Sequence, residues 1–204
     1  SYSVTGVQTC ALPIFPSPAT IPAIADRVIV VGGLSKSHAM TGWRLGYLAG
    51  PKYLVAACVA IQGQTTTCAS SIAQRAGIAA LDGDQAPAAA MAAAFRVRRD
   101  RALARFSAMP GLKLRAPEGA FYLFPDVSAL FGATGAGRTI ASSDDFCLYL
   151  LESAGVALVP GSAFGDDDCV RMSFAASDEA LDSALERIDA AVRALVRPAK
   201  AWPR

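Results

Sequence analysis

The segment with the clearest structural pattern reads Arg27-Val-Ile-Val-Val-Gly-Gly-Leu-Ser-Lys-Ser-His-Ala-Met-Thr-Gly-Trp-Arg-Leu-Gly-Tyr47. Residues 27–31 are rich in β-branched side chains and end at Gly32-Gly33, which is typical of a buried parallel strand. Lys36 follows this strand directly, and Arg44 comes after a further glycine-containing turn. We therefore predict a buried strand that delivers a lysine to its end.

After this segment, helix and strand patterns alternate along the chain. We expect a short strand at 45–48, helices at 53–62, 70–81 and 87–109, a strand at 120–124, a helix at 143–154, strands at 156–159 and 170–174, and a last helix capped by Ser177. This order predicts an α/β fold in which the end of a large-domain sheet (16–85) is followed by a long interdomain helix (86–109). A small α+β C-terminal domain (110–204) completes the chain.

The composition is that of a core-forming globular protein, with 53% hydrophobic and 18% charged residues. A net charge of +2 favours neither nucleic acid nor an anionic membrane surface. No apolar run approaches the roughly 20 residues of a membrane helix. The five cysteines form no Cys-x-x-Cys pair, and His38 is the single histidine. We expect a cytoplasmic protein in a reducing compartment, with no structural metal.

Residues 4–14, VTGVQTCALPI, resemble the translation of a common short-read sequencing adapter. No initiator methionine precedes them, and there is no basic region leading into an apolar stretch as in a signal peptide. We expect residues 1–15 to be an artefact and the natural protein to be longer. The alternative is a natural loop or strand with this sequence.

The segment from Gly33 to Tyr47 resembles the cofactor-lysine signature of class I aminotransferases of the aspartate aminotransferase type. It contains the Ser35-Lys36 pair, a glycine, and then Arg44 in an Arg-x-Gly sequence. The resemblance implies PLP-transferase fold type I and pyridoxal 5'-phosphate (PLP) as cofactor. Lys36 would hold the cofactor as a Schiff base, and Ser35 and Arg44 would bind it. The alternative is a surface lysine beside a turn.

The residue types suit this chemistry. A lysine amine attacks an aldehyde only when it is neutral, so the site must favour that form by desolvation or by neighbouring positive charge. A buried strand end would desolvate Lys36. Arg44 would add positive charge and would donate paired hydrogen bonds to a phosphate. Gly42 and Gly46 would remove side chains where backbone and phosphate pass closely.

A second match lies downstream, where residues 169–177 resemble the family segment that binds the substrate α-carboxylate through an arginine. Arg171 stands in that place. The alternative for Arg171 is a structural ion pair with a carboxylate of residues 166–168. Residues 117–122 and 159–164 also resemble family segments near the substrate mouth, but Phe121 and Tyr122 are expected to be core residues. His38 is expected to be a packing or turn residue.

The resemblance implies a transaminase that moves an amino group between an amino acid and a 2-oxo acid, homodimeric in its full-length form. Related enzymes carry, upstream of this lysine, an acid for the pyridine nitrogen, a stacking aromatic residue, and an Asn and Tyr for the cofactor O3′. None lies in this chain, so we expect the chain alone to be inactive and poorly soluble. Residues 61–74 contain no arginine for a second substrate carboxylate, which puts aspartate specificity in doubt.

Two other functions remain open at this point. Other fold-type I PLP enzymes, such as decarboxylases and acyl-CoA condensing enzymes, place a lysine similarly. A transcription regulator can also carry an aminotransferase-like effector domain behind a DNA-binding head. The gene sequence upstream of this chain distinguishes them, because a helix-turn-helix there would indicate a regulator.

Overall fold

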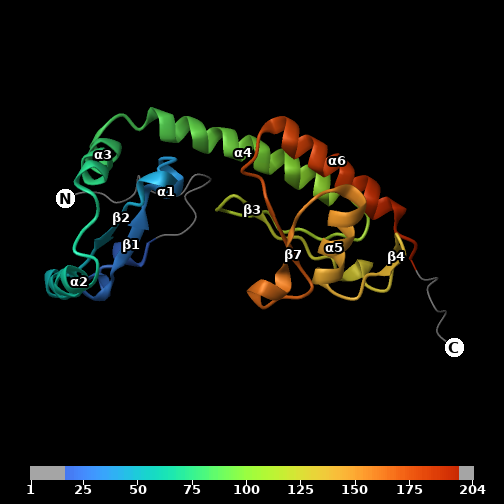
Figure 1. Cartoon of the computed structure of the whole chain (residues 1–204), viewed down its shortest axis with the longest axis horizontal. Coiled ribbons are helices and arrows are strands. Elements are labelled where there is room, and N and C mark those ends of the chain that lie inside the picture. The colour runs from blue at the N-terminus through green and yellow to red at the C-terminus, as the bar shows by residue number, and fades with distance from the viewer. Residues whose placement is uncertain (1–16, 198–204) are drawn as a thin grey trace. The chain divides into compact units, whose positions relative to one another are not determined.

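The computed structural model describes residues 17–197 of the chain (Figure 1). The adapter-like residues 4–14 lie outside the described range. The described residues form two compact units, which divide after Ala93, within the long helix α4 (Ala86–Ser107). The domain ranges expected from the sequence stay predictions.

The first unit is built around a two-stranded sheet. Strand β1 (Val30–Gly33) pairs antiparallel with β2 (Gly46–Ala49), with Val31 opposite Leu48 and Gly33 opposite Gly46. The remaining elements are η2 (Pro18–Thr20), η3 (Ala25–Arg27), α1 (Leu34–Ser37), η4 (Thr41–Trp43), α2 (Lys52–Thr65), α3 (Ser71–Asp82) and the start of α4.

The strand predicted at 27–31 begins later, at Val30, and the predicted parallel pairing is wrong for the described residues. Strand β1 pairs antiparallel, and the Val31 side chain is 77% exposed. The connection from β1 to β2 holds only α1 and η4 and reverses the chain, whereas a parallel pair needs a longer crossover. A β-branched run reports strand propensity but carries no information on the direction of the partner strand.

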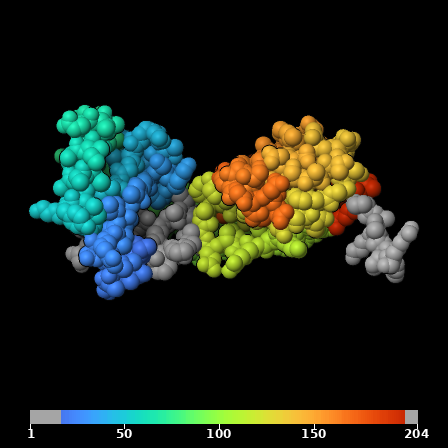
Figure 2. Space-filling view, turned by 90° about the horizontal axis from the view of Figure 1, so that it is seen from below, coloured from blue at the N-terminus to red at the C-terminus, as the bar shows by residue number. Residues whose placement is uncertain are grey.

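Apolar side chains of the first unit are largely exposed. Its buried hydrophobic residues among those described are Leu34, Met40 and Ala73. Helix α2 carries apolar residues on every side yet has no buried residue, and it lies on the visible surface in Figure 2 (cyan). A helix that is apolar all round is normally buried. The described residues therefore do not supply the surface that would cover this unit.

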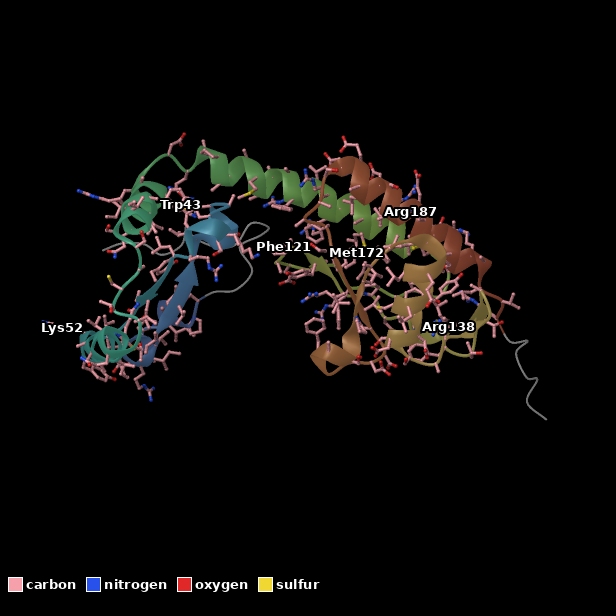
Figure 3. All side chains as sticks on the ribbon, viewed as in Figure 1. Trp43, Lys52, Phe121, Arg138, Met172 and Arg187 are labelled. Atoms are coloured by element: carbon pink, nitrogen blue, oxygen red, sulfur yellow. The ribbon has the colours of Figure 1, made fainter. Side chains whose placement is uncertain are left out.

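The second unit has a complete core. A three-stranded antiparallel sheet has the order β3-β7-β6, and β4 and β5 form a separate hairpin. The elements after α4 are β3 (Tyr122–Leu123), η5 (Ser128–Leu130), β4 (Thr134–Gly135), β5 (Arg138–Thr139), α5 (Ser143–Ala154), β6 (Val159–Pro160), η6 (Gly161–Phe164), β7 (Val170–Ser173) and α6 (Asp178–Ala194). Met172 on β7 (Figure 3) joins a buried cluster with Phe106, Leu150, Phe174 and Leu185.

Local signals place the helices of this unit. Helix α5 occupies the range expected from the sequence, and Ser177 caps α6 as expected, with its hydroxyl accepting a 3.2 Å hydrogen bond from the Ala180 amide. The Tyr149 hydroxyl donates a 2.8 Å hydrogen bond to the Ala191 carbonyl and so ties α5 to α6. Hydrogen bonds from Arg98 and Arg101 on α4 lower the pKa of the Asp178 carboxyl at the start of α6.

Burial also determines the protonation state of two thiols in the second unit. It raises the pKa of Cys147 to about 12 and, together with a hydrogen bond to Asp166, that of Cys169 to about 11. Both thiols are therefore protonated at neutral pH and unreactive. Within residues 17–197, no helix is long and apolar enough to cross a membrane, and no cluster of three potential metal ligands occurs.

The difference in burial between the units predicts a difference in local stability. In the chain expressed without residues 1–15, backbone amides of β1 and β2 should exchange with solvent much faster than those of β7 and α5. Amides that no core covers exchange through local opening, which costs less free energy than unfolding of the whole unit. Hydrogen–deuterium exchange with peptide-level mass spectrometry measures this directly, with β7 as the internal reference. Equal protection of β1 and β7 would contradict it.

Candidate functional site

Lys36 lies in α1, the single helical turn that directly follows β1. The Leu34 amide donates a 3.4 Å hydrogen bond to the Leu45 carbonyl, which ties the start of this turn to the residue before β2. The Lys36 side chain is exposed and Ser35 is half-buried. The desolvation expected from a buried strand is thus not supplied by the described residues.

Thr41 joins the lysine turn to the arginine turn. Its hydroxyl donates a 2.8 Å hydrogen bond to the Ser35 carbonyl, next to Lys36. Its own carbonyl accepts hydrogen bonds from the Arg44 amide at 3.4 Å and from Arg44 Nη1 at 3.3 Å. One residue therefore holds the backbone beside Lys36 and the backbone and side chain of Arg44. Sequence reasoning did not single out Thr41, because a hydroxyl-to-carbonyl bond across six residues has no sequence signature.

Arg44 adopts a left-handed backbone conformation, with φ of 53°. This conformation is unfavourable for a side chain with a Cβ and is concentrated at functional sites. The exposed Arg44 lines a cavity of about 440 Å³ whose wall also includes Gly32, Gly46, Tyr47, Gln62, Thr66 and Cys68. Lys36 does not line this cavity.

The glycines of the motif have different roles. A Cβ at Gly46 would lie 3.0 Å from the Gly32 carbonyl oxygen, so a side chain at residue 46 would push the two strands slightly apart. A Cβ at Gly32 would overlap the Tyr47 ring. At Gly42, however, an added Cβ meets nothing within 4 Å, so the described residues give no steric reason for that glycine.

His38 ends α1 and is held by its neighbours. Its Nδ1 lies 2.9 Å from the Ser37 hydroxyl, and its Nε2 lies 3.4 Å from Gln85 Oε1. Its backbone amide donates to the Leu34 carbonyl at 3.2 Å. These contacts fit the expected role of a turn residue.

Arg171 lies on β7 with its guanidinium between two aromatic rings. The guanidinium carbon is 4.5 Å from the ring centroid of Tyr122 and 4.5 Å from that of Phe164. Tyr122, expected to be a core residue, is instead half-exposed beside the arginine. Phe121 is also partly buried, and it packs against the core.

The alternative reading of Arg171, a structural ion pair, is not seen in the described part of the chain. No carboxylate there lies within 4 Å of the guanidinium. Asp167 accepts hydrogen bonds from the amide and hydroxyl of Ser143, and Asp166 accepts one from the Asp168 amide. Asp166 and Asp167 therefore accept hydrogen bonds from their own turn and from the start of α5, and neither pairs with Arg171.

Thr41 thus links the backbone at Ser35, beside Lys36, to Arg44 in the first unit, whereas Lys36 and Arg44 lie on two successive turns. Arg171 belongs to the second unit, where Tyr122 and Phe164 accompany it.

Comparison with known proteins gives consistent matches. The family model "Aminotransferase class I and II" matches residues 2–188. The chain is 50% identical over 187 residues to an aspartate aminotransferase of Pinus pinaster, covering 90% of this chain and 38% of that protein. It is 49% identical over 184 residues to a bifunctional aspartate aminotransferase and glutamate/aspartate-prephenate aminotransferase of Petunia hybrida, covering 88% of this chain and 38% of that protein.

A solved structure agrees with these matches. The aspartate aminotransferase of Rhizobium meliloti aligns with a TM-score of 0.85 and 45% identity over 89% of this chain and 46% of that one. This chain therefore spans less than half the length of the relatives it matches. The expected fold class, a truncated form of fold type I, is confirmed. With matches of this extent in both sequence and structure, the chain belongs to the class I and II aminotransferases.

Proposed function

We propose that this chain is the C-terminal part of a PLP-dependent transaminase that transfers an amino group between an amino acid and a 2-oxo acid. The observation that carries the proposal is the pair of turns linked by Thr41, which carry an amine and a guanidinium on one short segment in a chain of this family. The aminotransferase names of the relatives favour a transaminase over other PLP enzymes. A regulator would need a DNA-binding head upstream.

The residues present fit a phosphorylated aldehyde cofactor. Arg44, held by the Thr41 carbonyl, supplies a positive charge at the wall of a cavity of about 440 Å³, which is large enough for a phosphate. The Ser35 hydroxyl stands next to Lys36 as a further donor. Lys36 supplies the amine that attaches the aldehyde carbon.

When bound, PLP supplies an aldehyde that captures amino groups and a ring that withdraws electrons. The protein supplies attachment, orientation and proton transfer. Lys36 would hold the cofactor through its amine. The same amine, when free, would be the base that moves the proton of the substrate Cα.

Arg171 completes the proposal as the residue that binds the substrate α-carboxylate. A guanidinium donates two parallel N–H···O bonds and so fixes both the position and the plane of a carboxylate. Aspartate is the donor supported by the names of the relatives, although residues 61–74 offer no arginine for its second carboxylate. We further propose that the full-length protein is a cytoplasmic homodimer.

Lys36→Ala in the complete protein should abolish the visible absorbance of the attached cofactor and stop transamination, because the motif holds no other lysine. Folding should be nearly unchanged, since Lys36 is exposed. Absorbance spectra and a coupled transaminase assay test this. Lys52→Ala, at the exposed start of α2 (Figure 3), is the matched control and should behave as the parent. Retained turnover in Lys36→Ala would contradict the assignment of Lys36 as the residue that holds the cofactor.

Arg44→Ala should weaken cofactor retention more than it slows turnover at saturating cofactor. Each charge-assisted hydrogen bond to a phosphate contributes about 1.5–3 kcal/mol. Cofactor loss during dialysis, followed by absorbance, gives the comparison, with Arg75→Ala on exposed α3 as the control. If Arg44→Ala keeps its cofactor as well as the parent does, Arg44 is not the phosphate ligand.

Arg171→Lys should raise the KM for the amino acid at least tenfold while cofactor binding stays normal. Lysine keeps the charge but loses the paired geometry with a carboxylate. Steady-state kinetics with L-aspartate measures the effect, and Arg115→Lys, an exposed arginine of the same unit, is the control. An unchanged KM would indicate that Arg171 has a structural role and does not bind the substrate carboxylate.

A further inference from the structure

We propose that Tyr122 and Phe164 are positioning residues that hold the Arg171 guanidinium in the plane required for a carboxylate. The inference rests on the proposed role of Arg171 in substrate binding. A separate observation carries it. The ring centroids of Tyr122 and Phe164 each lie 4.5 Å from the guanidinium carbon of Arg171.

The register of the sheet places Tyr122 beside Arg171. Strand β7 alternates, with Val170 and Met172 buried and Arg171 and Ser173 on the opposite face. Tyr122 on β3 lies opposite Ser173, so it occupies the same face as Arg171 and is its diagonal neighbour. Diagonal neighbours in an antiparallel pair are within reach of aromatic and long side chains.

Phe164 reaches the arginine from the other neighbour of β7. Strand β6 pairs with β7 through Val159 opposite Arg171, and η6 then turns the chain back. A Cβ at Gly161 would overlap the Asp166 and Cys169 carbonyl oxygens, so this tight return requires glycine. Figure 2 shows this segment (orange) at the surface of the second unit.

The second ring is itself supported. Phe124 contacts Phe164 edge to face, with centroids 6.2 Å apart and an interplanar angle of 85°. Phe164 is 49% exposed, so its ring is only partly covered by such contacts. Gly165 ends the turn in a left-handed conformation with φ of 81°.

This arrangement has two consequences for binding. Two rings limit the rotation of a flexible side chain, so less conformational freedom remains to be lost when a carboxylate binds. The negative faces of the rings also stabilise the cation without using its in-plane N–H donors or neutralising its charge. A carboxylate partner at the same distance would compete with the substrate, and the described residues place none there.

The test removes the rings one at a time in the complete protein. Tyr122→Leu and Phe164→Leu should each raise the KM for L-aspartate about five- to thirty-fold, the range that corresponds to a partly desolvated cation–π contact. The kcat and the cofactor dissociation constant should change less than twofold. Tyr122→Phe and Phe164→Tyr keep a ring and should restore the parent KM. Phe131→Leu, which removes a ring packed against the core elsewhere in the unit, should leave KM unchanged.

A double-mutant cycle with Arg171→Lys separates positioning from a direct or structural role. If the rings act through the guanidinium, their removal in the Arg171→Lys background should raise KM less than twofold further. Additive effects, or ring variants with the parent KM while Arg171→Lys raises it, would overturn this inference alone. An unchanged KM in Arg171→Lys itself would instead overturn the proposed function. Because Phe164 is exposed, its variant should fold even if a Tyr122 variant does not.

Discussion

The alternation of strand β7 organises the second unit. Its inward residues, Val170 and Met172, enter a core that also buries Phe106 and Phe174, and α5 and α6 close over it. Because side chains alternate across a strand, the same burial forces Arg171 to the opposite face. Packing of the inward face therefore fixes the location of the candidate substrate-binding residue without any contact made by Arg171 itself.

The first unit is held in a different way. Lys36 and Arg44 are placed by a few hydrogen bonds around Thr41 and by the close approach of Gly46 to Gly32, while α2 and most of β1 remain uncovered. Hydrogen bonds exposed to water contribute little net stability, and apolar burial contributes most of it. The local geometry of the turn is thus encoded in the segment, whereas its rigidity depends on surfaces supplied from outside the described residues.

What the sequence predicted well has local causes. The range of α5 follows from its apolar periodicity, its Ser142 cap and the left-handed Gly155 at its end, and Ser177 similarly marks α6. The motif with Lys36 and Arg44 was also recognisable, because its residue types and spacing are rarely combined by chance. The errors concern relations between distant segments. The direction of the β1 partner depends on the chain connection, and the exposure of Tyr122 depends on strand register, neither of which a short window of sequence contains.

The surroundings of the arginines separate binding candidates from structural ones. Arg98, Arg101 and Arg138 each contact carboxylates, which neutralise their charge and tie elements together. Arg44 is instead held by a backbone carbonyl, and Arg171 by two rings, so both are oriented while their charge stays uncompensated in the described chain. An oriented and uncompensated cation attracts an anion more strongly than a paired one. A phosphate at Arg44 and a carboxylate at Arg171 are the anions that this chemistry requires, and the same physical rule accounts for both positions.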